Sequence, residues 1–206
     1  MKKGKFIVFE GIDGSGKTTQ ARMLVEYLES VGRRVVLTAE PTSLPSGRAL
    51  REALSGKVKK SECQMAVMFV DDRIAHNICE SEGIRALIDG GVDVICDRYY
   101  YSTLAYQGQS TDYEWVKSMN LRCPEIQHPD VCIYIDILPE QSLERIAKGR
   151  DSVEIYENME TLTKVREQFL SVIHDLENEE NICIIDGYRE QNQVFEDVCK
   201  SVRQIL

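Results

Sequence analysis

The stretch GIDGSGKTT at residues 11–19 decides how the rest of the chain is interpreted. It matches the pattern G-x-x-x-x-G-K-[ST], in which glycines let the backbone wrap closely around phosphate groups. A short apolar run at residues 5–9 precedes the stretch, and a helical segment at residues 17–30 follows it. This strand–loop–helix context is the one that the pattern requires. We therefore expect a phosphate-binding loop, here called the P-loop, between a buried strand and a helix.

The P-loop also predicts the roles of its side chains. Lys17 is expected to reach the β- and γ-phosphates of a nucleotide, and the Thr18 hydroxyl is expected to bind Mg²⁺. Inward-pointing N–H groups and the positive end of the following helix complete the predicted anion site. The residues predicted to bind the nucleotide are Gly11, Gly14, Ser15, Gly16, Lys17, Thr18 and Thr19.

Asp13 is an acid within a loop built for anions. Because its carboxylate would repel nucleotide phosphates, we interpret it as directed at a hydroxyl group of a second ligand. A solvated loop aspartate is the alternative interpretation. The chain lacks the N-K-x-D motif that reads guanine, which argues against a GTPase switch.

The apolar runs predict an α/β fold. Five short runs rich in β-branched residues stand at residues 5–9, 34–38, 92–96, 131–137 and 181–185. Near-continuous apolar strands are typical of a parallel sheet buried on both faces. Helical patterns fill the gaps, at residues 17–30, 46–54, 61–89, 113–120, 139–148, 153–178 and 191–205. We expect one domain over residues 1–206, with a three-layer P-loop NTPase fold and a five-stranded parallel sheet flanked by helices.

Composition indicates the class of protein and its cellular location. The 206 residues suit one domain, and a net charge of −9 disfavours a nucleic-acid surface. Seven cysteines are scattered without C-x-x-C pairs, which indicates reduced thiols and a cytoplasmic location. The N-terminus lacks the apolar region of a signal peptide, and no apolar run reaches 18 residues, so we expect no membrane span.

Polar or charged residues follow three of the predicted strands at the expected site. In open parallel sheets, ligands bind beyond the carboxyl ends of the strands. Glu10 and the P-loop follow the first strand, Glu40 follows the second, and Asp97 and Arg98 follow the third. Arg98 could grip a phosphate with two hydrogen bonds, while Asp97 could orient Mg²⁺ or hold the arginine. A structural ion pair at the end of the strand is the alternative.

Three further segments suggest a second substrate. Phe69 and Arg73 are four residues apart in a predicted helix, so they share a face that could stack and hydrogen-bond a base. A core phenylalanine beside a surface arginine is the alternative. The run at residues 102–108, STLAYQG, could read the edge and sugar of a nucleotide. Basic residues near Gly149 predict a lid over the phosphates at residues 145–155, although they could also only stabilise a helix C-terminus.

Together these motifs resemble the thymidylate kinase family, the dTMP kinases. The resemblance runs from residue 5 to at least residue 170, and the segment at residues 154–170 is most similar to archaeal members. The motifs that carry it are FEGIDGSGKTT at residues 9–19, EPT at 40–42, MFVDDRIAH at 68–76, DRYYYSTLAYQG at 97–108 and PDVCIYID at 129–136.

The resemblance implies ATP-dependent phosphorylation of dTMP to dTDP, with Mg²⁺, in dTTP biosynthesis. It implies that Phe69 stacks on the base and Arg73 reads a thymine carbonyl. The full substrate set that it implies is Asp13, Glu40, Phe69, Arg73, Arg98, Thr103, Tyr106 and Gln107. The catalytic set is Lys17, Asp97, Arg98, Arg145 and Arg150, with Thr18 and Asp97 as metal ligands. It also implies a homodimer, for which the helix at residues 61–89 is the candidate face. A helix packed in the core of one chain is the alternative for this segment.

Two positions depart from the family pattern. Many bacterial members carry an arginine where this chain has Ala39, and Arg48 or Arg51 could replace it. Some members carry an arginine in the P-loop at the position of Gly14. Its absence here predicts a catalytic arginine in the lid, with Arg145 and Arg150 as candidates.

Two other functions remain open from the sequence. One is a different kinase on the same scaffold, such as a deoxynucleoside kinase or a kinase for another nucleoside monophosphate. The other is a nucleotide-binding regulatory module without turnover, against which the intact Lys17, Thr18, Asp97 and Arg98 argue.

Overall fold

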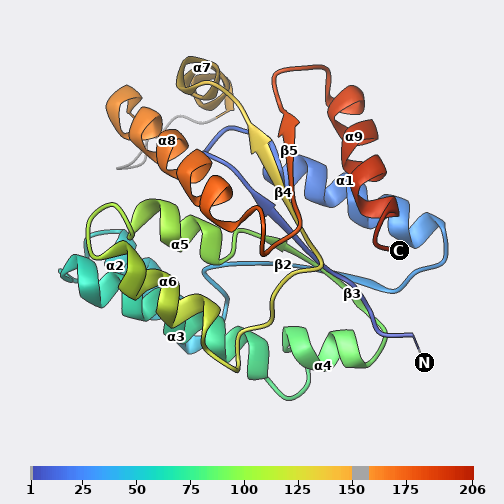
Figure 1. The fold of residues 1–206 in the computed structure, drawn as a ribbon, viewed down its shortest axis with the longest axis horizontal. Helices are drawn as coiled ribbons and strands as arrows, with labels where there is room; N and C mark the ends of the chain where they lie inside the picture. Colours follow the sequence, from blue (N-terminus) through green and yellow to red (C-terminus); the bar gives the residue numbers. More distant parts are fainter. Residues whose placement is uncertain (1, 150–157) are drawn as a thin grey trace.

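A computed structural model describes residues 2–149 and 158–206 of the chain (Figure 1). Its centre is a parallel sheet with the strand order β2-β3-β1-β4-β5. Each strand lies within one residue of its predicted position, so the predicted five-stranded α/β fold is confirmed. The strands are β1 (Phe6–Glu10), β2 (Val35–Ala39), β3 (Asp93–Asp97), β4 (Val131–Asp136) and β5 (Ile182–Asp186).

Helices cover both faces of this sheet (Figure 1). They are α1 (Lys17–Ser30), α2 (Pro45–Leu54), α3 (Glu62–Ile78), α4 (Ile84–Asp89), α5 (Tyr100–Tyr106), α6 (Tyr113–Leu121), α7 (Pro139–Gly149), α8 (Met159–Leu176) and α9 (Gln191–Arg203). Apolar residues of α1 and α9 pack on one face, and those of α3, α4, α5, α6 and α8 pack on the other. Among the helices of the described residues, none is both long and apolar enough to cross a bilayer.

The alternation of side chains along β1 explains the two cores. Phe6 and Val8 belong to the larger core beneath α5 and α8, while Ile7 and Phe9 belong to the core beneath α1 and α9. All four side chains are fully buried. A strand covered on both faces needs apolar residues at every position, which is the reason that a continuous apolar run predicted it correctly.

The prediction of a single helix over residues 61–89 is wrong, because the structure has two helices there. Helix α3 begins with a capping box, in which Ser61 and Gln64 satisfy each other's backbone N–H groups. It ends at Ile78, and at Cys79 the backbone turns to ψ 126°. A Cβ at Gly83 would lie 2.3 Å from the Cys79 carbonyl oxygen, so only glycine fits this turn before α4.

Helix α5 was not predicted from the sequence. Its residues read as a polar and aromatic recognition segment, and its N-cap residue Tyr99 supplies no side-chain cap. The cap comes instead from the Glu10 carboxylate at the end of β1, which accepts hydrogen bonds from the backbone N–H groups of Tyr99 (2.7 Å) and Ser102 (3.1 Å). A partner 89 residues away in the chain leaves no local signal in the sequence.

The first turn of α5 is also held by Glu180, in the turn before β5. Its carboxylate accepts hydrogen bonds from the hydroxyl of Tyr100 (2.5 Å) and from that of Tyr101. The Nδ1 atom of His128 lies 2.9 Å from the same carboxylate. The hydrogen bond to Glu180 raises the pKa of His128, and partial burial of the imidazole opposes that rise. This cluster joins α5, the segment before β4 and the turn after α8.

We predict that the contribution of His128 to stability depends on pH. Because its folded-state pKa is raised, the stabilisation is fully present below the ordinary value of 6.5 and is lost as pH rises through the raised value. Since the imidazole is about half exposed, we expect His128→Asn to lower Tm by on the order of 2 °C at pH 5.5 and by much less at pH 8.5. Thermal unfolding across this pH range provides the measurement.

The surface variant His174→Asn, on α8, serves as the control because the His174 side chain is 84 % exposed. A Tm difference for His128→Asn that stays constant or grows toward alkaline pH would contradict the proposed ion pair with Glu180.

Candidate active site

The candidate site lies at the carboxyl edge of the sheet, where the loops after β1, β2 and β3 meet. Two cavities open there, of about 700 Å³ and about 610 Å³. The first is lined by the P-loop, and the second by α2, α3 and α5. Asp13, Glu40 and Arg98 line both cavities, so two ligands bound in them would meet at these three residues.

Lys17 is embedded in the P-loop. Its side chain is 6 % exposed, and its Nζ donates hydrogen bonds to the carbonyl oxygens of Gly11 and Ile12, both at 2.9 Å. Burial, reinforced by the nearby Arg98, lowers the pKa of Lys17 to about 8. Carbonyl dipoles and nearby carboxylates keep the ammonium in place at the mouth of the loop, as its predicted role requires.

Helix α7 packs directly against the P-loop. Gly14 has φ +74°, and a Cβ there would lie 2.9 Å from the Ser142 carbonyl oxygen. The Ser142 hydroxyl donates to the Asp13 carbonyl oxygen at 2.5 Å. The absence of a side chain at residue 14 therefore has a steric reason in this chain, because α7 occupies the space that a side chain would need.

Arg145, one of the two lid candidates, points back to backbone carbonyls. Its guanidinium donates to the carbonyl oxygens of Ser15 (3.1 Å) and Gly187 (2.8 Å), and it lies 5.8 Å from the centroid of the Tyr188 ring. These contacts join α7 to the P-loop and to the loop after β5. The other candidate, Arg150, and residues 151–155 of the predicted lid lie outside the described residues.

Arg98 adopts a backbone conformation that is uncommon outside glycine. Its φ is +71°, in the left-handed region. Non-glycine residues there cost of order 1–3 kcal/mol and persist where the surroundings enforce them. The Arg98 N–H donates to the Phe9 carbonyl (3.0 Å), and the next residue, Tyr99, is held by the Glu10 carboxylate. The turn directs the Arg98 guanidinium toward Asp13, with which it forms an ion pair.

Glu10 has a role that the sequence did not reveal. It is fully buried, and burial raises the pKa of its carboxyl, whereas Arg98 and the hydrogen bonds from Ser102 and Tyr99 lower it. The signal in the sequence is a single acid at the end of a wholly apolar strand. A buried carboxylate needs several donors, and Glu10 finds them at the start of α5.

Thr18 and Asp97 lie together, as expected for metal ligands. The Thr18 hydroxyl donates to Asp97 Oδ2 at 2.5 Å. A hydroxyl and a carboxylate beside a phosphate site are the hard oxygen donors that Mg²⁺ prefers. The residues present therefore fit this ion.

The second cavity has the walls of a nucleotide site. Phe69 lines it from α3, while Tyr106 and Gln107 line it from α5 and its end. Burial raises the pKa of Tyr106 to about 12, so its phenol stays protonated. Among the described residues, Gln107 Oε1 and Arg73 Nε are buried atoms without a hydrogen-bond partner. Unpaired buried polar atoms in a cavity wall are suited to the edge of a base.

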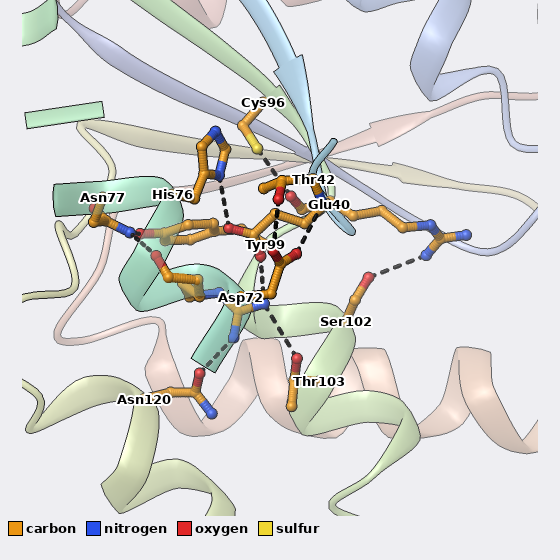
Figure 2. Close-up of polar contacts among 12 residues, drawn as sticks. Glu40, Thr42, Asp72, His76, Asn77, Cys96, Tyr99, Ser102, Thr103 and Asn120 are labelled. Atoms are coloured by element: carbon orange, nitrogen blue, oxygen red, sulfur yellow. Dashed lines mark hydrogen bonds and ion pairs between the residues drawn. The ribbon is translucent and has the colours of Figure 1, made fainter. Parts of the chain in front are cut away.

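Arg73 is held from three sides by Glu40, Asn120 and Thr103, which Figure 2 labels. Its guanidinium donates to Asn120 Oδ1 (2.6 Å) and to the Thr103 hydroxyl (3.2 Å), and it forms an ion pair with Glu40 Oε2 at 2.6 Å. The Arg73 side chain is 1 % exposed, so the alternative of a surface arginine does not hold. Thr103 is fully buried beneath Arg73 and is not among the lining residues, so it supports the arginine.

Several lining residues were not predicted. Helix α2 and its C-cap contribute Leu54, Ser55 and Arg51, of which the sequence suggested only Arg51, as a replacement for the missing arginine at position 39. Arg51 donates to the Pro41 carbonyl oxygen at 2.7 Å. The first cavity extends to the loop after β5 and the start of α9, with Gly187, Arg189, Glu190, Gln191 and Val194. No motif marks these residues; the fold brings them beside the P-loop.

Comparisons with known proteins agree with this geometry. A family model described as thymidylate kinase matches residues 9–198. A probable thymidylate kinase of Methanococcus aeolicus is 45 % identical over 172 residues, covering 83 % of this chain and 80 % of the relative. The thymidylate kinase of Sulfurihydrogenibium sp. is 35 % identical over 206 residues, covering 98 % of both chains. A match over most of the chain, together with these two relatives, places the protein in the thymidylate kinase family.

Proposed function

We propose that the protein transfers the γ-phosphoryl group of ATP to the phosphate of dTMP, giving ADP and dTDP. The single observation that carries the proposal is that two cavities meet at Asp13, Glu40 and Arg98. One cavity has a P-loop for the donor, and the other has an aromatic and hydrogen-bonding wall for the acceptor base. Membership of the thymidylate kinase family supports the same reaction.

The first cavity accommodates ATP. The P-loop N–H groups and Lys17 receive the phosphates, and the space beside Gly187 and Gln191 receives the adenosine end. Thr18 and Asp97 would hold Mg²⁺. When bound, this ion neutralises charge on the phosphate oxygens that it contacts.

The second cavity accommodates dTMP. Phe69 stacks on the thymine, Arg73 and Gln107 read its polar edge, and Tyr106 packs against the deoxyribose. Arg51 lies at the mouth of this cavity and takes the place of the arginine missing at position 39. Asp13 contacts the sugar hydroxyl of dTMP from the P-loop side.

Arg98 reduces the repulsion between the phosphates of ATP and dTMP. Two unit charges about 4 Å apart repel by about 4 kcal/mol at an effective dielectric of 20. The guanidinium of Arg98 lines both cavities, so it can contact the dTMP phosphate and the transferring group together. Burial opposes its charge, but the neighbouring Asp13 and other acids raise the pKa of Arg98 above its usual value, and it remains a cation.

The transfer needs no strong general base. An oxygen of the dTMP phosphate, already anionic, forms the new P–O bond while the bond to the β-phosphate bridging oxygen breaks. Positioning and charge neutralisation therefore carry catalysis. This separates the proposal from a deoxynucleoside kinase, in which a carboxylate must remove a proton from a 5′-hydroxyl.

The remaining parts of the proposal concern the lid, the assembly and the location. We assign residues 145–155 to a lid of the single domain, with Arg150 as the catalytic arginine and Arg145 as the residue that positions the P-loop. Helix α3 supplies a homodimer face, because Cys63, Val67 and Ile78 are exposed on it at helical spacing. Seven free cysteines favour a cytoplasmic location.

An acceptor screen with ATP and Mg²⁺ tests the reaction itself. We expect dTMP to be used about tenfold better than dUMP, because one buried methyl is worth about 1–3 kcal/mol. We expect discrimination against dCMP of on the order of 10² or more, since Arg73 meets an amino group where thymine has a carbonyl. ADP release with each nucleotide and with thymidine is measured.

The same screen separates the alternatives. Efficient use of thymidine indicates a deoxynucleoside kinase, and ATP binding without acceptor-dependent ADP release indicates a regulatory module. Equal turnover of dTMP and dCMP refutes the role of Arg73.

A pair of arginine variants tests the lid. We expect Arg150→Ala to lower kcat by on the order of 10³, by analogy with arginine fingers. Arg145→Ala removes contacts to Ser15 and Gly187, so it should mainly raise the KM for ATP. Steady-state kinetics provides both constants. If each variant keeps kcat within a few-fold of wild type, the lid carries no catalytic arginine.

Introducing charge into the exposed apolar face tests the dimer. Val67 and Ile78 are each 47 % exposed on α3, and lysines there would be buried unpaired in an interface. We expect Val67→Lys combined with Ile78→Lys to convert a dimer into a monomer in light scattering. The control is Ile184→Lys, since Ile184 is 55 % exposed on β5 and lies outside α3. A wild type that is monomeric at micromolar concentration refutes the assembly.

A further inference from the structure

His76 is a buried titratable residue that the proposed reaction does not use. It lies on α3, three residues after Arg73, and is 6 % exposed. It is not among the residues that line either cavity, so it does not touch a ligand bound there. The contacts of His76 must therefore explain why an imidazole is buried beside the nucleotide site.

Both ring nitrogens of His76 have a partner. Nδ1 lies 3.0 Å from Glu40 Oε1, and Nε2 lies 2.8 Å from the Thr38 hydroxyl. A carboxylate only accepts hydrogen bonds, so the proton must be on Nδ1. Nε2 is then free to accept the Thr38 hydroxyl proton. The Glu40 carboxylate therefore selects this tautomer, and the Thr38 hydroxyl, from β2, holds the other side of the ring.

Glu40 connects this imidazole to the base-reading arginine. Its second oxygen, Oε2, forms the 2.6 Å ion pair with Arg73. The side chains of Glu40 and Arg73 are 3 % and 1 % exposed. The carboxylate and the guanidinium balance each other's charge, and His76 adds a hydrogen-bond donor to this pair. Figure 2 shows His76 and Glu40 on the side of the cluster away from Asn120 and Thr103.

The orientation of Glu40 matters because this residue lines both cavities. A carboxylate turned toward the cavities would repel the phosphates of both nucleotides. The backbone after Glu40 is already fixed, since Asp72 accepts hydrogen bonds from the Thr42 N–H (2.8 Å) and hydroxyl (2.6 Å). The rotation of the Glu40 carboxylate is what remains to be fixed, and His76 holds it.

We propose that His76 is a positioning residue for recognition of the acceptor base. Its Nδ1–H holds the Glu40 carboxylate against Arg73, so that Arg73 is directed at the base before dTMP binds. The inference rests on the proposed function, because it assigns the second cavity to dTMP. It adds a chain of hydrogen-bonded residues, Thr38–His76–Glu40–Arg73, here called the relay. Through this relay, residues outside the cavity determine the specificity for the base.

Two substitutions of His76 separate positioning from packing. His76→Phe keeps a ring of similar size but removes both hydrogen bonds. His76→Asn places an amide N–H where Nδ1 is and restores the donor to Glu40. The matched control is Val202→Ala, which removes a fully buried side chain from α9 on the opposite face of the sheet. All variants are compared by Tm, by steady-state kinetics and by calorimetric binding of dTMP.

We expect His76→Phe to raise the KM for dTMP by about tenfold to a hundredfold, as for a lost hydrogen bond to a charged group. The preference for dTMP over dCMP should fall by a similar factor, while the KM for ATP changes less than about twofold. His76→Asn should recover the dTMP KM to within about threefold of wild type. Val202→Ala should lower Tm but leave the nucleotide preference unchanged.

A double-mutant cycle tests the route through Glu40. If His76 acts only on that carboxylate, His76→Phe should have less than about a twofold effect on the dTMP KM in a Glu40→Gln background. If the effects of the His76 and Glu40 substitutions on the dTMP KM are additive, the relay is refuted. Should His76→Phe fail to fold, Thr38→Val replaces it. We expect a rise of roughly threefold to tenfold in the dTMP KM, because the ring loses the hydrogen bond that holds Nε2.

The failures of the two proposals are distinguishable. Suppose that the wild type is active and that the kinetic constants and dTMP affinity of His76→Phe lie within about twofold of the wild-type values. The positioning role alone is then refuted. That role is also refuted if the dTMP and ATP constants rise together, or if His76→Asn is as impaired as His76→Phe. A wild type that neither binds nor phosphorylates dTMP refutes the proposed function, and the inference with it.

Discussion

The buried carboxylate of Glu10 is the constraint on which the site depends. It stands at the end of β1, directly before the P-loop, and caps α5 through the N–H groups of Tyr99 and Ser102. Its Oε2 also accepts the Ser102 hydroxyl at 2.7 Å. One side chain thus fixes the distance between the donor loop and the acceptor helix. The left-handed backbone of Arg98 is enforced by this anchoring.

On the acceptor side, too, a buried charged group is held by hydrogen bonds from several segments of the chain. Arg73 is buried, and it is preorganised by Glu40, Asn120 and Thr103 from three separate segments. A guanidinium with fixed partners loses little conformational freedom when a ligand binds, which supports the role in base discrimination that we propose for Arg73. Buried polar networks of this kind are costly when incomplete, which explains why His76 and Thr38 extend the network behind Glu40.

The sequence predicted the donor site better than the acceptor site. Residues 11–19 are contiguous, and their geometry follows from local backbone rules, so Lys17, Thr18 and Gly14 could be placed without a structure. The acceptor residues are scattered over α2, α3 and α5, and only the family resemblance grouped them. Thr103 illustrates the limit: its position in the motif suggested contact with the base, but the packing places it beneath Arg73.

What the sequence alone determined was the parallel sheet and the phosphate site, because apolar runs and the glycine pattern act over a few residues. Tertiary structure decided the rest. The break between α3 and α4 depends on a close approach at Gly83, and α5 depends on a cap from Glu10, so neither follows from helical periodicity. The relay from His76 to Arg73 joins residues from β2, the loop after it and α3. Only folding brings these three segments within hydrogen-bonding distance, since α3 lies far from β2 in the chain.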